Sequence, residues 1–86
     1  MFEVYLLKGA EGELESLPKK THDKINEHIK TLSQFPDVRQ CKKISGYEDT
    51  FRLRVGRYRV LFKVYSNEKV IVVSKVGQRG NVYRGL

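Results

Sequence analysis

Three arginines in the second half of the chain have a spacing that suggests phosphate chemistry. Arg52 and Arg54 alternate with apolar residues, and Arg59 follows shortly after the pair Gly56-Arg57. If Gly56-Arg57 forms a two-residue type II′ hairpin turn, Arg54 lies directly opposite Arg59. Facing like charges destabilise a sheet by about a few tenths of a kcal/mol, whereas an anion between the guanidinium groups would relieve the repulsion. The pattern therefore predicts that this surface binds phosphate groups, the other reading being solvated arginines on an exposed sheet.

The other side chains of the same two segments predict which sheet face is covered. Every second position is apolar or aromatic, namely Phe51, Leu53, Val55, Tyr58, Val60 and Phe62. This face carries enough apolar area to hold the helices expected earlier in the chain. We therefore expect the arginine face to be open to solvent, as in a nucleic-acid-binding groove.

The carboxyl-terminal segment adds a second group of polar side chains. Residues 77–84 follow the last expected strand and contain two glycines, Arg79 and Tyr83. We expect this segment to bring Arg79 and Tyr83 to the arginine face. The Tyr83 phenol could stack on a base, and it could accept a proton if nearby cations lowered its pKa from about 10. The alternative is that Tyr83 only packs as a terminal aromatic residue.

The charge distribution supports an anionic partner. The net charge is +7, but residues 1–38 hold five lysines against seven acids, whereas residues 39–86 hold seven arginines and five lysines against three acids. Arginine has the planar geometry that suits phosphate, so phosphate-bearing partners are expected first. The alternative is that the basic residues only maintain solubility. One cysteine, Cys41, and two histidines, His22 and His28, do not form a zinc ligand set, so we expect no metal and no cofactor.

The remaining patterns predict a small α+β fold. An amino-terminal strand over residues 2–7 precedes a helix over 10–17 and a second helix from 19 to about 35, and the two helices form a hairpin. An antiparallel meander follows, with strands near 51–55, 58–64 and 70–76, and the helices pack on one sheet face. Its length of 86 residues predicts one domain, 1–86. No apolar run is long enough for a membrane span and no signal peptide is visible, so we expect a cytoplasmic protein without a membrane partner.

Residues 43–62, KISGYEDTFRLRVGRYRVLF, closely resemble the central motif of the RelE/ParE superfamily of bacterial and archaeal toxins. Arg79 and Tyr83 resemble the ending of the RelE branch. The resemblance covers essentially the whole chain and implies a RelE-like fold. It also implies a type II toxin that cleaves mRNA on the ribosome without metal, and a cognate RelB-like antitoxin as partner. The alternative is a ParE-like toxin that does not cleave RNA and acts on DNA gyrase.

The same resemblance implies individual roles. Arg59 matches the arginine that stabilises the transition-state phosphate, Arg79 the basic residue near the leaving group, and Tyr83 the tyrosine that orients or deprotonates the nucleophile. Arg52 and Arg54 stand where the family has two lysines. Since an arginine stays charged, these two are expected to give electrostatic support, which makes Tyr83 the favoured base. The cations expected to contact RNA around this centre are Lys42, Lys43, Arg57 and Arg84.

Overall fold

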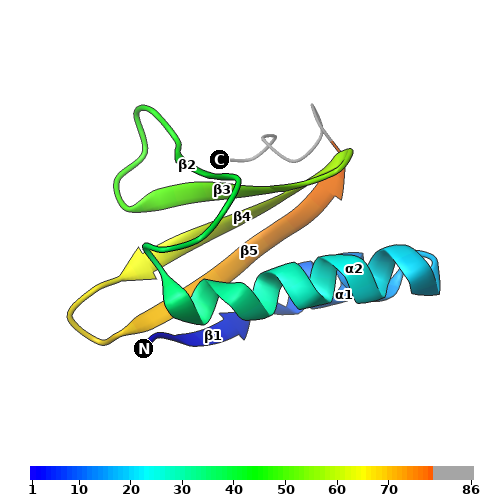
Figure 1. Ribbon diagram of the computed structural model, residues 1–86, viewed down its shortest axis with the longest axis horizontal. Coiled ribbons are helices and arrows are strands. Elements are labelled where there is room, and N and C mark those ends of the chain that lie inside the picture. Colours follow the sequence, from blue (N-terminus) through cyan, green and yellow to red (C-terminus); the bar gives the residue numbers. More distant parts are fainter. Residues whose placement is uncertain (79–86) are drawn as a thin grey trace.

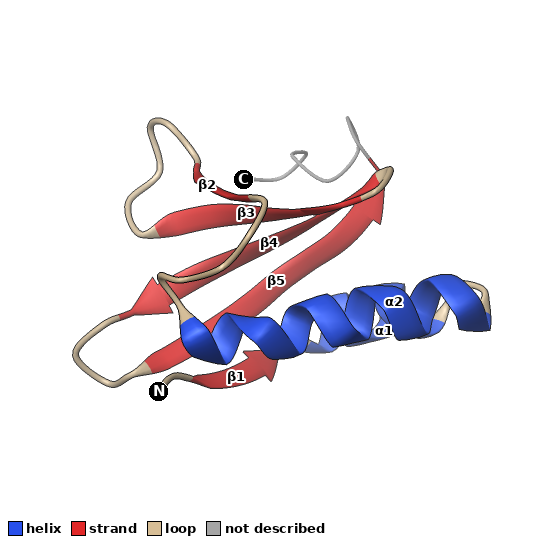
Figure 2. Ribbon diagram, in the orientation of Figure 1, coloured by secondary structure: helices blue, strands red, loops and turns tan. Residues whose placement is uncertain are grey.

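Two helices lie against one face of a five-stranded sheet in the computed structural model, which describes residues 1–78 (Figures 1 and 2). In chain order the elements are β1 (Glu3–Leu6), α1 (Lys8–Glu15), α2 (Lys19–Lys30), a 3₁₀ turn η1 (Thr31–Gln34), β2 (Cys41–Lys43), β3 (Thr50–Val55), β4 (Tyr58–Tyr65) and β5 (Val70–Gln78). The α+β class and the covering of one sheet face by the helices are confirmed.

The sheet has the order β1-β5-β4-β3-β2, so the first strand lies beside the last. β3, β4 and β5 form the expected antiparallel meander, whereas β1 pairs with β5 in parallel, with Tyr5 opposite Val72. The short strand β2 pairs with β3 at the other edge and was not predicted. Three residues are too few to show an alternating pattern, so β2 exists only through its pairing with β3.

The hydrophobic core lies between the helices and the sheet. Helical spacing brings Ala10 and Leu14 of α1, and Ile25 and Ile29 of α2, onto the face that meets the strands. From the sheet, alternate positions fill the same layer: Leu53, Val55, Val60, Phe62, Val64, Ile71, Val73 and Val76. The apolar face predicted for the hairpin is therefore the buried one.

Both helices end earlier than predicted, each some residues before a proline. Leu17 precedes Pro18 and cannot easily be helical, so α1 ends at Glu15, and Pro18 stands at the N-cap of α2 instead. Towards Pro36, α2 ends at Lys30 and tightens into η1. The Thr31 hydroxyl donates a 2.6 Å hydrogen bond to the His28 carbonyl, a local bond that accompanies this tighter turn.

One side chain of α1 completes the backbone hydrogen bonding of β5. β1 ends at Leu6, opposite Val73, so the second half of β5 extends beyond its parallel neighbour. There the Glu13 carboxylate accepts a 2.9 Å hydrogen bond from the backbone N–H of Val76. This bond ties α1 to the strand that runs past the arginine face.

Candidate nucleic-acid interface

The hairpin β3–β4 sets the geometry of the candidate site. Val55 pairs with Tyr58 and Arg54 pairs with Arg59, as predicted from the sequence. Gly56 has a φ of 59° at the first central position of the turn, the left-handed conformation that a type II′ turn needs there. The two guanidinium-bearing residues are therefore direct cross-strand neighbours on one face of the sheet.

The arginine face is less open than predicted. Arg54 is exposed and Arg52 is half-buried, but Arg59 is only 6% exposed. Leu61, opposite Arg52 on the same face, is fully buried. The prediction of a fully solvated face is thus wrong at these two positions of β4. β4 is flanked by β3 and β5, so its side chains lie between those of two neighbouring strands.

A hollow of about 310 Å³ is lined by both members of the arginine pair, Arg54 and Arg59, and by the turn residue Arg57. Gly56 and Gln78 complete its lining. Within residues 1–78, no carboxylate oxygen lies within 4 Å of the guanidinium groups of Arg54, Arg57 or Arg59. The hollow therefore concentrates positive charge that the described part of the protein leaves unneutralised. One of the three charged side chains, Arg59, is buried.

Gln78 is a lining residue that the sequence analysis missed. The last strand was predicted to end at residue 76, whereas β5 continues to Gln78, which pairs with Tyr58. The sequence carries no local signal for this extension, because the glycine at position 77 disfavours a strand, and Gly77 and Gln78 join β5 only through their pairing with Arg59 and Tyr58. The Gln78 amide can donate and accept hydrogen bonds, so it could orient a phosphate or a sugar hydroxyl.

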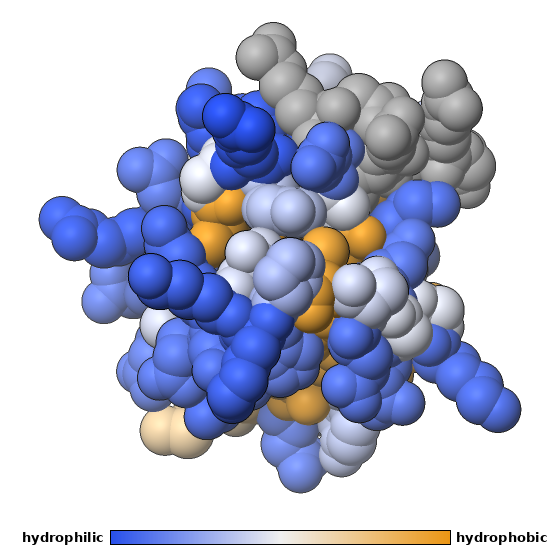
Figure 3. All heavy atoms as spheres, turned by 90° about the vertical axis from the view of Figure 1, so that its right-hand side faces the viewer, coloured by the Kyte–Doolittle hydropathy of each residue, from blue (hydrophilic) through white to orange (hydrophobic). Residues whose placement is uncertain are grey.

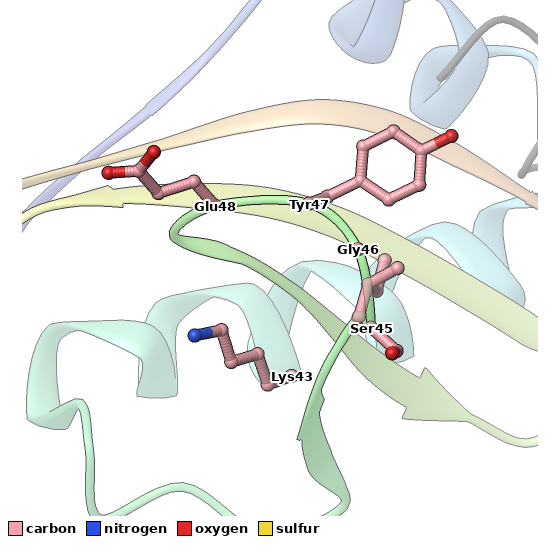
Figure 4. A pocket seen from close by; sticks show the side chains of 6 residues that line it. Lys43, Ser45, Gly46, Tyr47 and Glu48 are labelled. Carbon is pink, nitrogen blue, oxygen red and sulfur yellow. The ribbon is translucent and has the colours of Figure 1, made fainter.

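The two lysines of β2 lie on different faces. Lys42 pairs with Arg52 and thus joins the arginine face, whereas Lys43 pairs with Phe51, whose alternation places it with the helices. Lys43 lines another hollow, of about 540 Å³, formed by the loop from Lys43 to Glu48, where it points away from Tyr47 (Figure 4). The structure therefore brings Lys42, Arg52, Arg54, Arg57 and Arg59 together and does not bring Lys43 to them.

Cys41 lies next to this cluster. Its thiol is half-buried, and this burial raises the pKa of the Cys41 thiol, while the positive charge of Arg52 acts in the opposite direction. In the part of the chain described, no three His, Cys, Asp or Glu side chains gather to form a metal-binding group. Over the same residues, neither helix has the length and apolar character to cross a membrane.

Three predicted site residues, Arg79, Tyr83 and Arg84, lie outside the described residues. Their proposed roles rest on the sequence. Gln78, the last described residue, lies at the hollow, so the chain leaves β5 beside the arginine pair.

Comparison with known families identifies the chain. Residues 4–83 match the family described as ParE toxin of type II toxin-antitoxin system, parDE. The chain belongs to this toxin family. Apart from Glu3 at the start of β1, the match spans both helices and all five strands of the described residues, so the resemblance to the RelE/ParE superfamily is confirmed.

Individual relatives of the toxin carry RelE names. The RelE1 protein of Methanocaldococcus jannaschii is 28% identical, over 96% of each chain. The archaeal RelE–RelB complex from Pyrococcus horikoshii contains a chain that is 30% identical, with a TM-score of 0.76, over 94% of this chain and 98% of that one. The toxin–antitoxin complex RelBE2 of Mycobacterium tuberculosis contains a chain that is 27% identical, with a TM-score of 0.78, over 91% of this chain and 98% of that one. The protein is thus a RelE-like toxin of the type II class.

The fold also matches that of the isolated RelE toxin of E. coli, with a TM-score of 0.78 at 18% identity, over 91% of this chain and 84% of that one. At this sequence identity the match shows only that the two folds are similar.

Proposed function

We propose that the toxin is a metal-independent endoribonuclease that cleaves mRNA on the ribosome and so stops translation. The observation that carries the proposal is the pairing of Arg54 with Arg59 across the hairpin, without a carboxylate near either among residues 1–78. A folded domain gains nothing from two facing cations, but a pentavalent phosphate with extra negative charge would be stabilised between them.

The proposed reaction is attack of an RNA 2′-hydroxyl on the adjacent phosphorus. The 2′-oxygen–phosphorus bond forms as the bond from phosphorus to the 5′-oxygen breaks, leaving a 2′,3′-cyclic phosphate and a 5′-hydroxyl. A base takes the 2′-hydroxyl proton, and the leaving 5′-oxygen gains a proton from water. The charge-stabilising role falls to Arg59, because a buried guanidinium interacts more strongly with an anion than a solvated one.

The other steps are assigned by residue type. Arg52 and Arg54 support the phosphate electrostatically, because arginine cannot serve as a proton acceptor near neutral pH. Tyr83 is proposed as the base and Arg79 as the group near the leaving oxygen, both from the family resemblance. Lys42, Arg57 and Arg84 are proposed to hold the flanking RNA.

A RelB-like antitoxin is the proposed protein partner. The relative from Pyrococcus horikoshii was solved as a complex of RelE with RelB, and the relative from Mycobacterium tuberculosis as the toxin–antitoxin complex RelBE2. We propose that an acidic segment of the antitoxin meets the arginine hollow. Its affinity should then fall as salt is raised, because exposed charge pairs are screened.

A second candidate function is inhibition of DNA gyrase without RNA cleavage. The family description, which names the ParE toxin, favours this candidate. The two candidates differ in their first effect on a cell, since a gyrase inhibitor causes DNA damage, whereas a ribonuclease halts protein synthesis.

Controlled expression of the toxin tests the proposal. Within minutes of induction, primer extension on mRNA should show new 5′ ends, and labelled amino-acid incorporation should stop. Arg59→Ala should abolish both effects, whereas Lys30→Ala, which removes an exposed cation paired with Glu27 on α2, should retain them. Full toxicity of Arg59→Ala, or a DNA-damage response without new mRNA ends, would contradict the ribonuclease proposal.

A further inference from the structure

We propose that Lys20 and Lys24 of α2, together with Arg57 of the β3–β4 turn, form a second RNA-binding surface that continues the arginine hollow around the turn. This surface, the α2–turn track, would hold the phosphate backbone of RNA beyond the cleavage position. The inference rests on the proposed function, and it was not predicted from the sequence.

Three hollows meet at the same turn. Besides the arginine hollow, a hollow of about 300 Å³ has Lys20 and Lys24 on its α2 side and Arg57 on its turn side. Another, of about 420 Å³, places Lys24 and His28 across from Arg54. Gly56 lines all three, so only the tip of the hairpin separates the cations of α2 from those of the arginine face.

The ion pairs of α2 leave these particular lysines unneutralised. Nζ of Lys19 lies 3.3 Å from Oδ2 of Asp23, and Nζ of Lys30 lies 3.0 Å from Oε2 of Glu27. By contrast, neither Lys20 nor Lys24 has a carboxylate oxygen within 4 Å in the described residues. The acids of α2 are therefore paired with the lysines outside these hollows, and the side of the helix that faces the turn keeps its positive charge.

The position of Lys20 is also electrostatically unfavourable for the helix. It lies in the first turn of α2, where the helix dipole disfavours cations, and this turn contains no acidic residue. Lys20 and Lys24 are one helical turn apart on the same side, so their ammonium groups repel each other. An anion bound along this side would relieve both effects.

A polynucleotide fits these observations better than an acidic protein segment. RNA carries one negative charge per nucleotide, so a single strand can neutralise the cations of neighbouring hollows in series. The end of the molecule that holds the turn is mostly hydrophilic around a small apolar strip (Figure 3). One wall of the hollow of about 300 Å³ includes Tyr58, whose half-buried ring could contact a base or a ribose.

Binding of RNA that cannot be cleaved tests the α2–turn track. The probe is a fluorescent single-stranded RNA oligomer carrying 2′-O-methyl groups, which removes the attacking hydroxyl, and anisotropy gives its Kd at several salt concentrations. The variant is the double substitution Lys20→Gln and Lys24→Gln. Its matched control is Lys19→Gln with Lys30→Gln, which removes the same charge from the same helix.

The Lys20/Lys24 variant should bind the RNA about 10-fold more weakly, and the slope of log K against log salt should become smaller by about 1.4, for two lost phosphate contacts. The control should bind as the wild type does. Circular dichroism checks that both variants remain folded, which is expected because all four lysines are exposed. The Lys20/Lys24 variant should unfold at the wild-type temperature or slightly above it, because it removes the repulsion between these two lysines.

Equal RNA affinities of the two double variants would overturn the inference. So would a Lys20/Lys24 variant that binds RNA normally but loses affinity for the antitoxin, because the surface would then serve a protein. A wild-type toxin that does not bind the RNA oligomer at all would also overturn it. Cleavage of ribosome-bound mRNA by the wild type is scored separately, so failure of the track and failure of the proposed function are distinguishable.

Discussion

Arg54 of β3 and Arg59 of β4 are direct cross-strand neighbours, yet the first side chain is exposed and the second is buried. The two residues therefore share one electrostatic environment but differ in how much packing each contributes. A substitution of the exposed Arg54 removes the repulsion at little cost in buried contacts. A substitution of the buried Arg59 removes the repulsion too, but it also removes buried contacts.

We therefore expect Arg54→Gln to raise the free energy of unfolding by about a few tenths of a kcal/mol, because it removes a like-charge pair. RNA cleavage should fall in the same variant. Urea denaturation measures the first effect and a single-turnover cleavage assay the second. As a control, Arg39→Gln removes one exposed positive charge outside the hairpin and should leave stability unchanged. If both variants had wild-type stability, the two arginines would not repel each other in the folded state.

Gly56 should be sensitive to substitution although space is available around it. Apart from Gly56 itself and its two neighbours in the chain, no atom lies within 4 Å of a Cβ placed there, but its φ of +59° costs a residue with a side chain about 1–2 kcal/mol. Gly56→Ala should therefore lower the free energy of unfolding by this amount. Gly12→Ala, equally free of contacts but inside α1, should instead raise it by about 0.5–1 kcal/mol. Chemical denaturation measures both variants, and the changes in the free energy of unfolding must have opposite signs for this account to hold.

The hydrogen bond between Glu13 and the Val76 N–H should contribute measurably to stability. Glu13→Ala leaves a partly buried backbone donor without its partner, which costs about 1–3 kcal/mol. Glu13→Gln should retain most of the stability, because the amide oxygen can still accept the bond. Glu15→Ala, at an exposed position of the same helix, serves as control and should change the free energy of unfolding by about 0.5 kcal/mol or less. Equal stabilities of Glu13→Ala and Glu15→Ala would show that the bond is not formed in solution.

Cys41 should react slowly with alkylating reagents. Burial raises the pKa of its thiol, so near neutral pH a smaller fraction is present as the reactive thiolate than in a free thiol. The rate of labelling by iodoacetamide should rise as the pH is raised and should approach that of a small thiol when the protein is unfolded in urea. Because the charge of Arg52 lowers the pKa of Cys41, Arg52→Gln should slow labelling further at fixed pH. Faster labelling of Arg52→Gln would mean that Arg52 acts on Cys41 only by covering it.

Tyr83→Phe tests the proposed base. Loss of one acid–base group typically lowers a rate by about 10²- to 10⁴-fold, so we expect single-turnover cleavage to fall by at least about 100-fold. RNA binding should change little, because the ring can still stack on a base. Tyr83→Ala should weaken both. If Tyr83→Phe cleaves RNA at the wild-type rate, the tyrosine acts only as a stacking surface. Catalysis would then rest on charge stabilisation by the arginines.

The sequence alone determined the features that depend on neighbouring residues. A two-residue turn with glycine at its first position, flanked by alternating side chains, admits one register, and so the pairing of Arg54 with Arg59 was predictable. The apolar residues of the helices likewise recur with a local period, and this period decides which face of each helix meets the sheet.

Only the tertiary structure decided the features that depend on distant partners. β2 forms through its pairing with β3, and this pairing separates Lys42 from Lys43. The length of β5, and with it the place of Gln78, depends on how far β4 extends. The burial of Arg59 and the meeting of α2 with the turn at Gly56 arise from packing between elements far apart in the chain, for which a local pattern carries no signal.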